Sequence, residues 1–162
     1  MSADTGEYFV GAYLKYALHC NLIDYNVRES GGGLKGLGEL DVIGYDFKND
    51  VVYLCEVTTH IKGLLYTDIA NTIIKIQQKH INQKNYALNN LQRFKNIKYM
   101  FWSPYVPVGG ITDGLNQISG LDLVINSDYT IKFKELEIIA ATQSHPDTNP
   151  VFRTLQIMGH LK

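Results

Sequence analysis

The sequence predicts an α/β fold with a mixed central sheet flanked by helices. Segments with helical and strand-like patterns alternate along the chain without internal repeats. Residues 39–45 and 51–58 read as strands joined by a short turn, so one antiparallel hairpin is explicit and the sheet is mixed. The 162 residues are 45% hydrophobic, which is enough for one core without disulfides. We therefore expect a single domain over residues 1–162.

The chain begins with a predicted amphipathic helix over residues 7–19, where apolar residues recur at helical spacing. Asp4 and Glu7 have the spacing of a capping box. A short strand is predicted over 23–28, followed by a glycine-rich loop over 30–38. This loop contains GxGxxG but leads into a strand, so no dinucleotide site is expected. It is either a loop that approaches a ligand or a plain connector.

The rest of the chain continues the alternation. A long helix is predicted over 67–91, with Ile69, Ile73, Ile76 and Leu88 as its candidate inward residues. A strand over 96–102 ends where prolines stop strand pairing. Beyond it we expect a short helix over 112–119, a strand over 121–126, a stretch of ambiguous pattern over 130–140 and a final helix over 149–161.

The net charge of -1 hides an uneven distribution of charged residues. Residues 1–59 hold four basic and nine acidic side chains, whereas residues 60–100 hold seven basic and one acidic. A near-neutral total argues against a strongly basic nucleic-acid binder. The basic middle of the chain nevertheless offers a local surface for phosphates.

Several classes of protein are not expected. No apolar run is long enough to span a bilayer and no signal peptide is visible, so we expect a cytoplasmic protein without membrane contact. Cys20 and Cys55 have apolar neighbours and no CxxC spacing, which favours reduced core cysteines. The histidines lack paired spacing, so no zinc site is expected.

Acidic residues on the two hairpin strands are predicted to face one another. A turn centred on Lys48 and Asn49 places Asp41 directly opposite Glu56, with Cβ atoms roughly 5 Å apart. A turn one residue later keeps both on one face, whereas an odd-numbered loop separates them. Two opposed carboxylates among apolar neighbours cost stability, and Mg²⁺ held by one or two carboxylates would offset that cost. Glu7 adds a third acid on the apolar face of the first helix.

At these residues the sequence resembles the PD-(D/E)XK nuclease superfamily, whose members share the restriction-endonuclease-like fold. Their pattern is an acid on the first helix, an acid on one hairpin strand and (D/E)-x-K on the next strand. Glu7 matches the first position, Asp41 in GELDVIG the second and Glu56 in LCEVT the third. The spacing looks most like archaeal Holliday junction resolvases and Mrr-like restriction enzymes. The resemblance covers roughly residues 5–100.

One position departs from the superfamily pattern. Thr58 stands where the pattern has its lysine. In some members of the superfamily this lysine has moved to the following helix, and here Lys75 and Lys79 lie one helical turn apart. Lys75 is the preferred candidate because it is nearer the N-terminal half of the helix, and Gln78 is a candidate assistant.

The resemblance implies a Mg²⁺-dependent endonuclease of the restriction or repair type that acts on DNA, with a homodimer as a candidate assembly. Asp41, Glu56 and the backbone carbonyl of Val57 would hold Mg²⁺, or Mn²⁺ in its place, with Glu7 binding directly or through water. Lys75 or Lys79 would position or deprotonate the attacking water. The nucleic-acid contacts would come from Lys35, Lys62, Lys75, Lys79 and Lys84.

Other interpretations remain open at this point. Thr58 motivates a catalytically inactive nuclease-fold protein that binds nucleic acid or a partner protein. A third candidate is a metal-bound structural domain with a peptide or small-molecule ligand. Capping is the alternative role for Glu7, and a solvated helix face is the alternative for Lys75 and Lys79. His60 is either a phosphate contact or an ordinary loop histidine.

Overall fold

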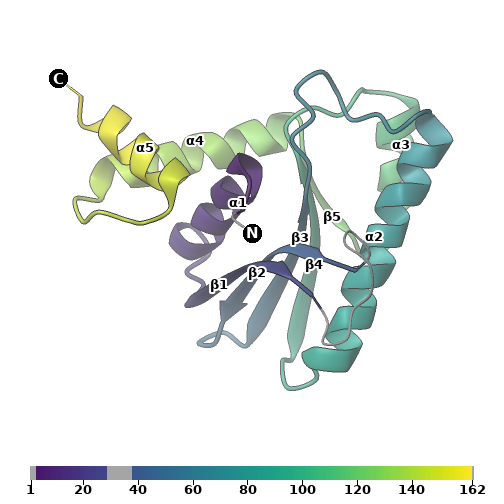
Figure 1. The fold of residues 1–162 in the computed structure, drawn as a ribbon, viewed down its shortest axis with the longest axis horizontal. Coiled ribbons are helices and arrows are strands. Elements are labelled where there is room, and N and C mark those ends of the chain that lie inside the picture. The colour runs from purple at the N-terminus through teal and green to yellow at the C-terminus, as the bar shows by residue number, and fades with distance from the viewer. Residues whose placement is uncertain (1–2, 29–37, 162) are drawn as a thin grey trace.

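The computed structural model describes residues 3–28 and 38–161, and its five strands form one sheet with helices on both faces (Figure 1). The strands are β1 (Leu22–Val27), β2 (Leu40–Asp46), β3 (Val51–Val57), β4 (Asn96–Ser103) and β5 (Asp122–Ile125). The helices are α1 (Thr5–Tyr16), α2 (Ile69–Asn90), α3 (Gly110–Asn116), α4 (Ser127–Thr142) and α5 (Pro150–Gly159). The predicted α/β class is confirmed.

The sheet is mixed, as the hairpin predicted. Its strand order follows the chain, β1-β2-β3-β4-β5. The β1–β2 and β2–β3 pairs are antiparallel, whereas the β3–β4 and β4–β5 pairs are parallel. Parallel neighbours need a crossover, and α2 and α3 provide the two crossovers on the same face of the sheet (Figure 1).

Each face of the sheet has its own helices. On one face α1, α4 and α5 pack against alternate strand residues such as Val42, Cys55 and Trp102. On the other face Leu54 packs with α2, and Phe101 packs with α2 and α3. Strand side chains alternate between faces, so neighbours such as Phe101 and Trp102 enter opposite cores.

The structure assigns the one stretch that the sequence left open and corrects one expectation about the long helix. The ambiguous stretch over 130–140 lies entirely within α4. In α2, Ile69 and Leu88 were expected to face inward but are 50% and 67% exposed. The helix instead buries Thr72, Ile76, His80, Gln83 and Ala87.

Hydrogen bonds explain why polar residues replace apolar ones on the inner face of α2. The Gln83 side chain donates to the backbone oxygens of Leu54 and Met100, at 3.0 and 3.1 Å. His80 lies 3.1 Å from Gln83 and 3.1 Å from the backbone oxygen of Ser119. Buried polar groups are tolerated where such bonds satisfy them, so α2 is attached to β3 and β4 by hydrogen bonds as well as apolar contact.

The expectation of two reduced core cysteines is met in the described residues. Cys20 and Cys55 are buried and unbridged. Across residues 3–28 and 38–161, none of the helices combines the length and the apolar character needed to cross a membrane.

Candidate active site

The hairpin has the predicted register. Val42 pairs with Cys55 and Asp46 with Val51, which centres the loop on Lys48 and Asn49. The buried Asp46 carboxylate fixes this loop, because it accepts hydrogen bonds from the Asn49 backbone N–H at 3.0 Å and from the Asn49 side chain at 2.6 Å. Continuing the register by one pair sets Asp41 beside Glu56, on the face that meets α2.

Asp41 lies where the β2–β3 ladder ends. Its Oδ2 accepts a hydrogen bond from the Val57 backbone N–H at 2.7 Å, and its side chain is only 16% exposed. Burial raises the pKa of Asp41, while the nearby Lys79 charge and the Val57 N–H oppose that rise. The carboxylate is therefore fixed by β3 and turned toward the helix layer.

Glu56 is the most deeply buried acid of the site, with a side chain that is 3% exposed. Burial, followed by the charge of Asp41, raises the pKa of Glu56 to about 8. Its Oε2 accepts a hydrogen bond from Lys79. Its Oε1 is buried and has no hydrogen-bond partner among the described residues. A free carboxylate oxygen beside a second acid suits a divalent cation, which takes oxygen ligands from one or two carboxylates.

Lys79 is the lysine that reaches these acids. It projects from α2, binds Glu56 and lies 3.8 Å from Asp41 Oδ2. Burial opposes its charge, but the two carboxylates outweigh burial and raise the pKa of Lys79. The favoured candidate Lys75 is instead exposed, with its Nζ 3.8 Å from the centroid of the Tyr66 ring. Gln78, the candidate assistant, is exposed and bonds Asn82.

Glu7 is used in the N-terminal cap of α1. Its Oε2 accepts from the Asp4 backbone N–H at 2.9 Å and from the Asn26 side chain at 3.3 Å. Burial raises the pKa of Glu7, and Asp41 is among the charges that add to this rise. The capping role is therefore present, and Glu7 stays within electrostatic range of the hairpin acids.

The donor set for a metal is smaller than the sequence pattern suggested. Within the described ranges, no group of three or more His, Cys, Asp or Glu side chains is arranged to hold a metal ion. Asp41 and Glu56 are the two acids that converge, and Val57 contacts Asp41 through its N–H. The ammonium of Lys79 lies against both acids, in the place that a cation between them would take.

Two buried hydroxyls lie next to the site, and sequence reasoning missed the second of them, that of Ser103. Thr58 Oγ1 and Ser103 Oγ have no hydrogen-bond partner among the residues described. Thr58 follows Glu56 by two positions and shares its face. The parallel pairing of Val57 with Trp102 continues to Thr58 beside Ser103. The alternation of β4 around Phe101 and Trp102 is the sequence signal that places Ser103 on the α2–α3 side.

The proposed nucleic-acid lysines are only partly brought together. Lys75 and Lys79 share one face of α2, whereas Lys84 is exposed nine positions after Lys75, which is about half a turn around the helix. Lys62 is exposed on the loop that precedes α2. Lys35 and most of the glycine-rich loop lie outside the described residues.

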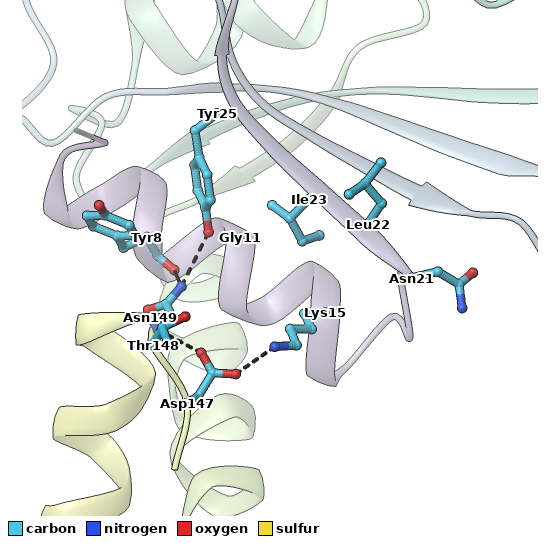
Figure 2. A pocket seen from close by; sticks show the side chains of 10 residues that line it. All are labelled: Tyr8, Gly11, Lys15, Asn21, Leu22, Ile23, Tyr25, Asp147, Thr148 and Asn149. Carbon is cyan, nitrogen blue, oxygen red and sulfur yellow. Dashed lines mark hydrogen bonds and ion pairs between the residues drawn. The ribbon is translucent and has the colours of Figure 1, made fainter. Parts of the chain in front are cut away.

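A separate cavity of about 470 Å³ lies between α1, β1 and the segment before α5 (Figure 2). Asp147 on its wall binds Lys15 at 2.6 Å and also accepts from Tyr16 and from the Asn149 backbone N–H. Its charged group is thus already paired within the chain. None of the hairpin acids lines this cavity, because α1 and β1 form it whereas Asp41 and Glu56 meet Lys79 of α2.

Comparison with known proteins finds no match to the chain among protein-family models, curated proteins or solved structures. Functional assignment therefore depends on the side chains themselves. Among the described residues, Asp41, Glu56 and Lys79 combine convergent charges, burial and an unsatisfied carboxylate oxygen. Perturbed ionisable groups of this kind are typical of functional sites.

Proposed function

We propose that the chain is a Mg²⁺-dependent endonuclease that hydrolyses DNA phosphodiester bonds. The observation that carries this proposal is the position of Lys79, which reaches from α2 to Glu56 and Asp41. The resemblance to PD-(D/E)XK nucleases requires two acids on the hairpin and a lysine beside them. Thr58 cannot supply that cation, and Lys79 supplies it from the following helix.

Asp41 and Glu56 would hold the metal through their carboxylate oxygens. Bound Mg²⁺ lowers the pKa of a coordinated water and stabilises negative charge on the phosphate. The unpartnered Oε1 of Glu56 and the nearby Asp41 carboxylate are suitable donors for this ion. Glu7 would support the same cluster through its negative charge, while its carboxylate keeps the cap of α1.

Lys79 would act on the reacting groups. Its side chain is 27% exposed, so the ammonium borders both the buried acids and solvent. From this position it orients the attacking water and stabilises charge that develops on the phosphate. The water oxygen bonds to phosphorus, the bond to the leaving sugar oxygen breaks, and the water proton passes to solvent or the leaving group.

The basic middle of the chain favours a phosphate-bearing substrate. Residues 60–100 carry seven basic side chains and one acidic side chain. Lys62 lies on the loop before α2, and Lys75 lies on α2 one turn before Lys79. Lysines that neutralise phosphates add affinity without reading base sequence.

Cleavage assays test the proposal directly. Purified protein would be incubated with supercoiled plasmid, branched DNA and RNA, in Mg²⁺, Mn²⁺ or EDTA. We expect metal-dependent cutting of DNA that is lost in Asp41→Asn and Glu56→Gln. Glu39→Gln is the matched control, because Glu39 lies outside the site and pairs with Arg28 at 2.7 Å.

The alternatives give different results in the same assay. Cutting that persists in both acid variants would exclude this site as the source of activity. Metal-independent binding of DNA without cutting in any metal would instead support a catalytically inactive nuclease-fold protein. Calorimetric titration with Mn²⁺ adds a readout without DNA, and we expect heat of binding for the wild type that Glu56→Gln loses.

A further inference from the structure

Tyr66 is held next to the site by an unusual turn. The Asp68 backbone N–H donates to the Tyr66 carbonyl oxygen at 2.6 Å, which closes a three-residue turn around Thr67. Thr67 has a φ of 62°, a left-handed conformation that β-branched residues rarely adopt. Backbone strain of this kind persists where the surroundings enforce it, and it is concentrated at functional sites.

Thr72 fastens this turn to the start of α2. Its buried Oγ1 accepts from the Tyr66 backbone N–H at 2.8 Å and donates to the Asp68 carbonyl oxygen at 2.7 Å. Asp68 in turn caps α2 by accepting from the Asn71 backbone N–H at 2.8 Å. The backbone of Tyr66 is therefore rigidly joined to the helix that carries Lys79.

The Tyr66 ring is also fixed in orientation. Lys75 Nζ lies 3.8 Å from the ring centroid, and the His60 ring meets the Tyr66 ring edge to face with centroids 5.1 Å apart. A cation over an aromatic face is a favourable contact. Lys75, the candidate catalytic lysine, and His60, the candidate phosphate contact, thus hold the Tyr66 ring in place.

The Tyr66 hydroxyl lies within electrostatic range of Lys79, Asp41 and Glu56. Lys75, whose Nζ lies over the ring, and Lys79, which binds Glu56, are one turn apart on the same face of α2, a rise of about 6 Å. The charges of Lys79, Asp41 and Glu56 all act on the Tyr66 hydroxyl, although burial is the main reason that the pKa of Tyr66 is raised. The hydroxyl has no hydrogen-bond partner among the described residues. It is a protonated donor with free capacity.

We infer that Tyr66 is a substrate-contacting residue whose hydroxyl donates a hydrogen bond to a non-bridging oxygen of the scissile phosphate. Lys75 orients the ring and adds positive charge beside the same phosphate. This inference rests on the proposed function. It assigns a specific task to the strained turn and explains why Lys75 lies on Tyr66 instead of on the acids.

The test compares Tyr66→Phe with Tyr53→Phe. Tyr53 is the matched control, because it also loses one hydroxyl but lies on the opposite face of the sheet, in the α1 core. Single-turnover cleavage of a DNA duplex in Mg²⁺ gives the rate, and fluorescence anisotropy in Ca²⁺ gives DNA affinity. For Tyr66→Phe we expect a rate at least about tenfold lower, since donors to transition-state oxyanions carry effects of this size or larger. DNA affinity and melting temperature should change little, and Tyr53→Phe should cut at the wild-type rate.

A phosphorothioate substrate distinguishes a direct contact between Tyr66 and the phosphate from a purely structural role of Tyr66. After the cut position has been mapped, one non-bridging oxygen there is replaced by sulfur, in each diastereomer separately. For one diastereomer, sulfur should slow the wild type more than it slows Tyr66→Phe, because the variant has no hydrogen bond left to weaken. Equal sulfur effects in both proteins, or a Tyr66→Phe rate equal to that of the wild type, would overturn the inference while leaving the nuclease intact. Absence of wild-type cutting in any metal would instead reject the proposed function, and this inference with it.

Discussion

Lys79 of α2 and Glu56 of β3 form an ion pair whose glutamate side chain is 3% exposed and whose lysine side chain is 27% exposed. Asp41 Oδ2 lies 3.8 Å from the same ammonium. The single positive charge of Lys79 therefore neutralises only one of the two carboxylates. When Asp41 and Glu56 are both ionised, the buried site carries one excess negative charge. A proton on Glu56 or a bound cation would remove that excess, and the raised pKa of Glu56 is the signature of the first solution.

Removing Lys79 should destabilise the metal-free fold. Lys79→Met leaves two facing acids without a counter-charge, and breaking a buried pair in this way costs about 3 kcal/mol. Urea unfolding in EDTA at pH 9, above the pKa of about 8 at which Glu56 ionises, measures the free energy of unfolding. Adding Glu56→Gln to Lys79→Met should recover part of the loss, because it removes the unpaired buried charge.

Lys75→Met is the control for that measurement. Its exposed ammonium contacts the Tyr66 ring, and such contacts contribute about 1 kcal/mol or less. An equal loss of stability in the two lysine variants would contradict the special position of Lys79.

The stability of the metal-free protein should fall as the pH rises from about 5 to about 8. Burial and Asp41 raise the pKa of Glu56 from 4.5 to about 8, so the folded protein keeps a proton that the unfolded chain has released. The free energy of unfolding then decreases with pH by up to about 1.4 kcal/mol per unit. The raised pKa values of Asp41 and Glu7 act in the same direction.

Glu56→Gln isolates the contribution of this one group. The amide does not titrate, so the variant should lose less stability between pH 5.5 and 8.5 in EDTA. It should also be relatively more stable than the wild type at the alkaline end. Parallel pH profiles for the two proteins would show that Glu56 is not the titrating group.

The hairpin and its facing acids were predictable because they depend on local rules. Strand alternation and the length of one turn fix the register, and Asp46 holds that turn by bonding Asn49 three residues away. The choice between Lys75 and Lys79 was not local. Both share a helix face, and only the docking of α2 on β3 and β4 decides which one meets Glu56.

That docking depends on partners distant in the sequence. Gln83 enters the core because backbone oxygens of Leu54 and Met100 accept its hydrogen bonds. A polar residue on a helix normally predicts a solvent-facing position, so periodicity alone favoured Ile69 and Leu88 as inward residues. Tyr66 was missed for a similar reason, since the role we infer for it depends on a strained turn that has no sequence signature.

Asp147 should stabilise the packing of α1 against the segment that leads into α5. Its carboxylate is 8% exposed and accepts bonds from Lys15 (Figure 2), from Tyr16 and from the Asn149 backbone N–H. Asp147→Ala leaves these donors without their partner, which should lower the free energy of unfolding by about 1 to 3 kcal/mol. Glu137→Ala, on the exposed side of α4, is the control in the same urea titration. A loss no larger than that of the control would show that the contacts of Asp147 add nothing to stability.

Moving the lysine back to the hairpin should rescue a Lys79 variant. In the proposed mechanism Lys79→Met removes the group that would orient the attacking water, so we expect cleavage to slow by about 100-fold or more. Thr58 lies two positions after Glu56 on the same face of β3, at the position where the superfamily pattern has its lysine. In the Thr58→Lys, Lys79→Met double variant, the new ammonium can approach both acids, and the shorter methionine side chain on α2 leaves space that reduces crowding.

The rescue is measured as single-turnover cleavage in Mg²⁺, with circular dichroism to confirm that each variant is folded. We expect the double variant to cut at least about tenfold faster than Lys79→Met, since a positioned cation near the developing charge is restored. Thr58→Val combined with Lys79→Met is the matched control, because valine keeps the volume of threonine without adding a charge. The prediction is contradicted by a folded double variant that binds Mn²⁺ but cuts no faster than this control. In that case Lys79 contributes more than a positive charge near Asp41 and Glu56, and a lysine at position 58 of the strand cannot replace the lysine of the helix.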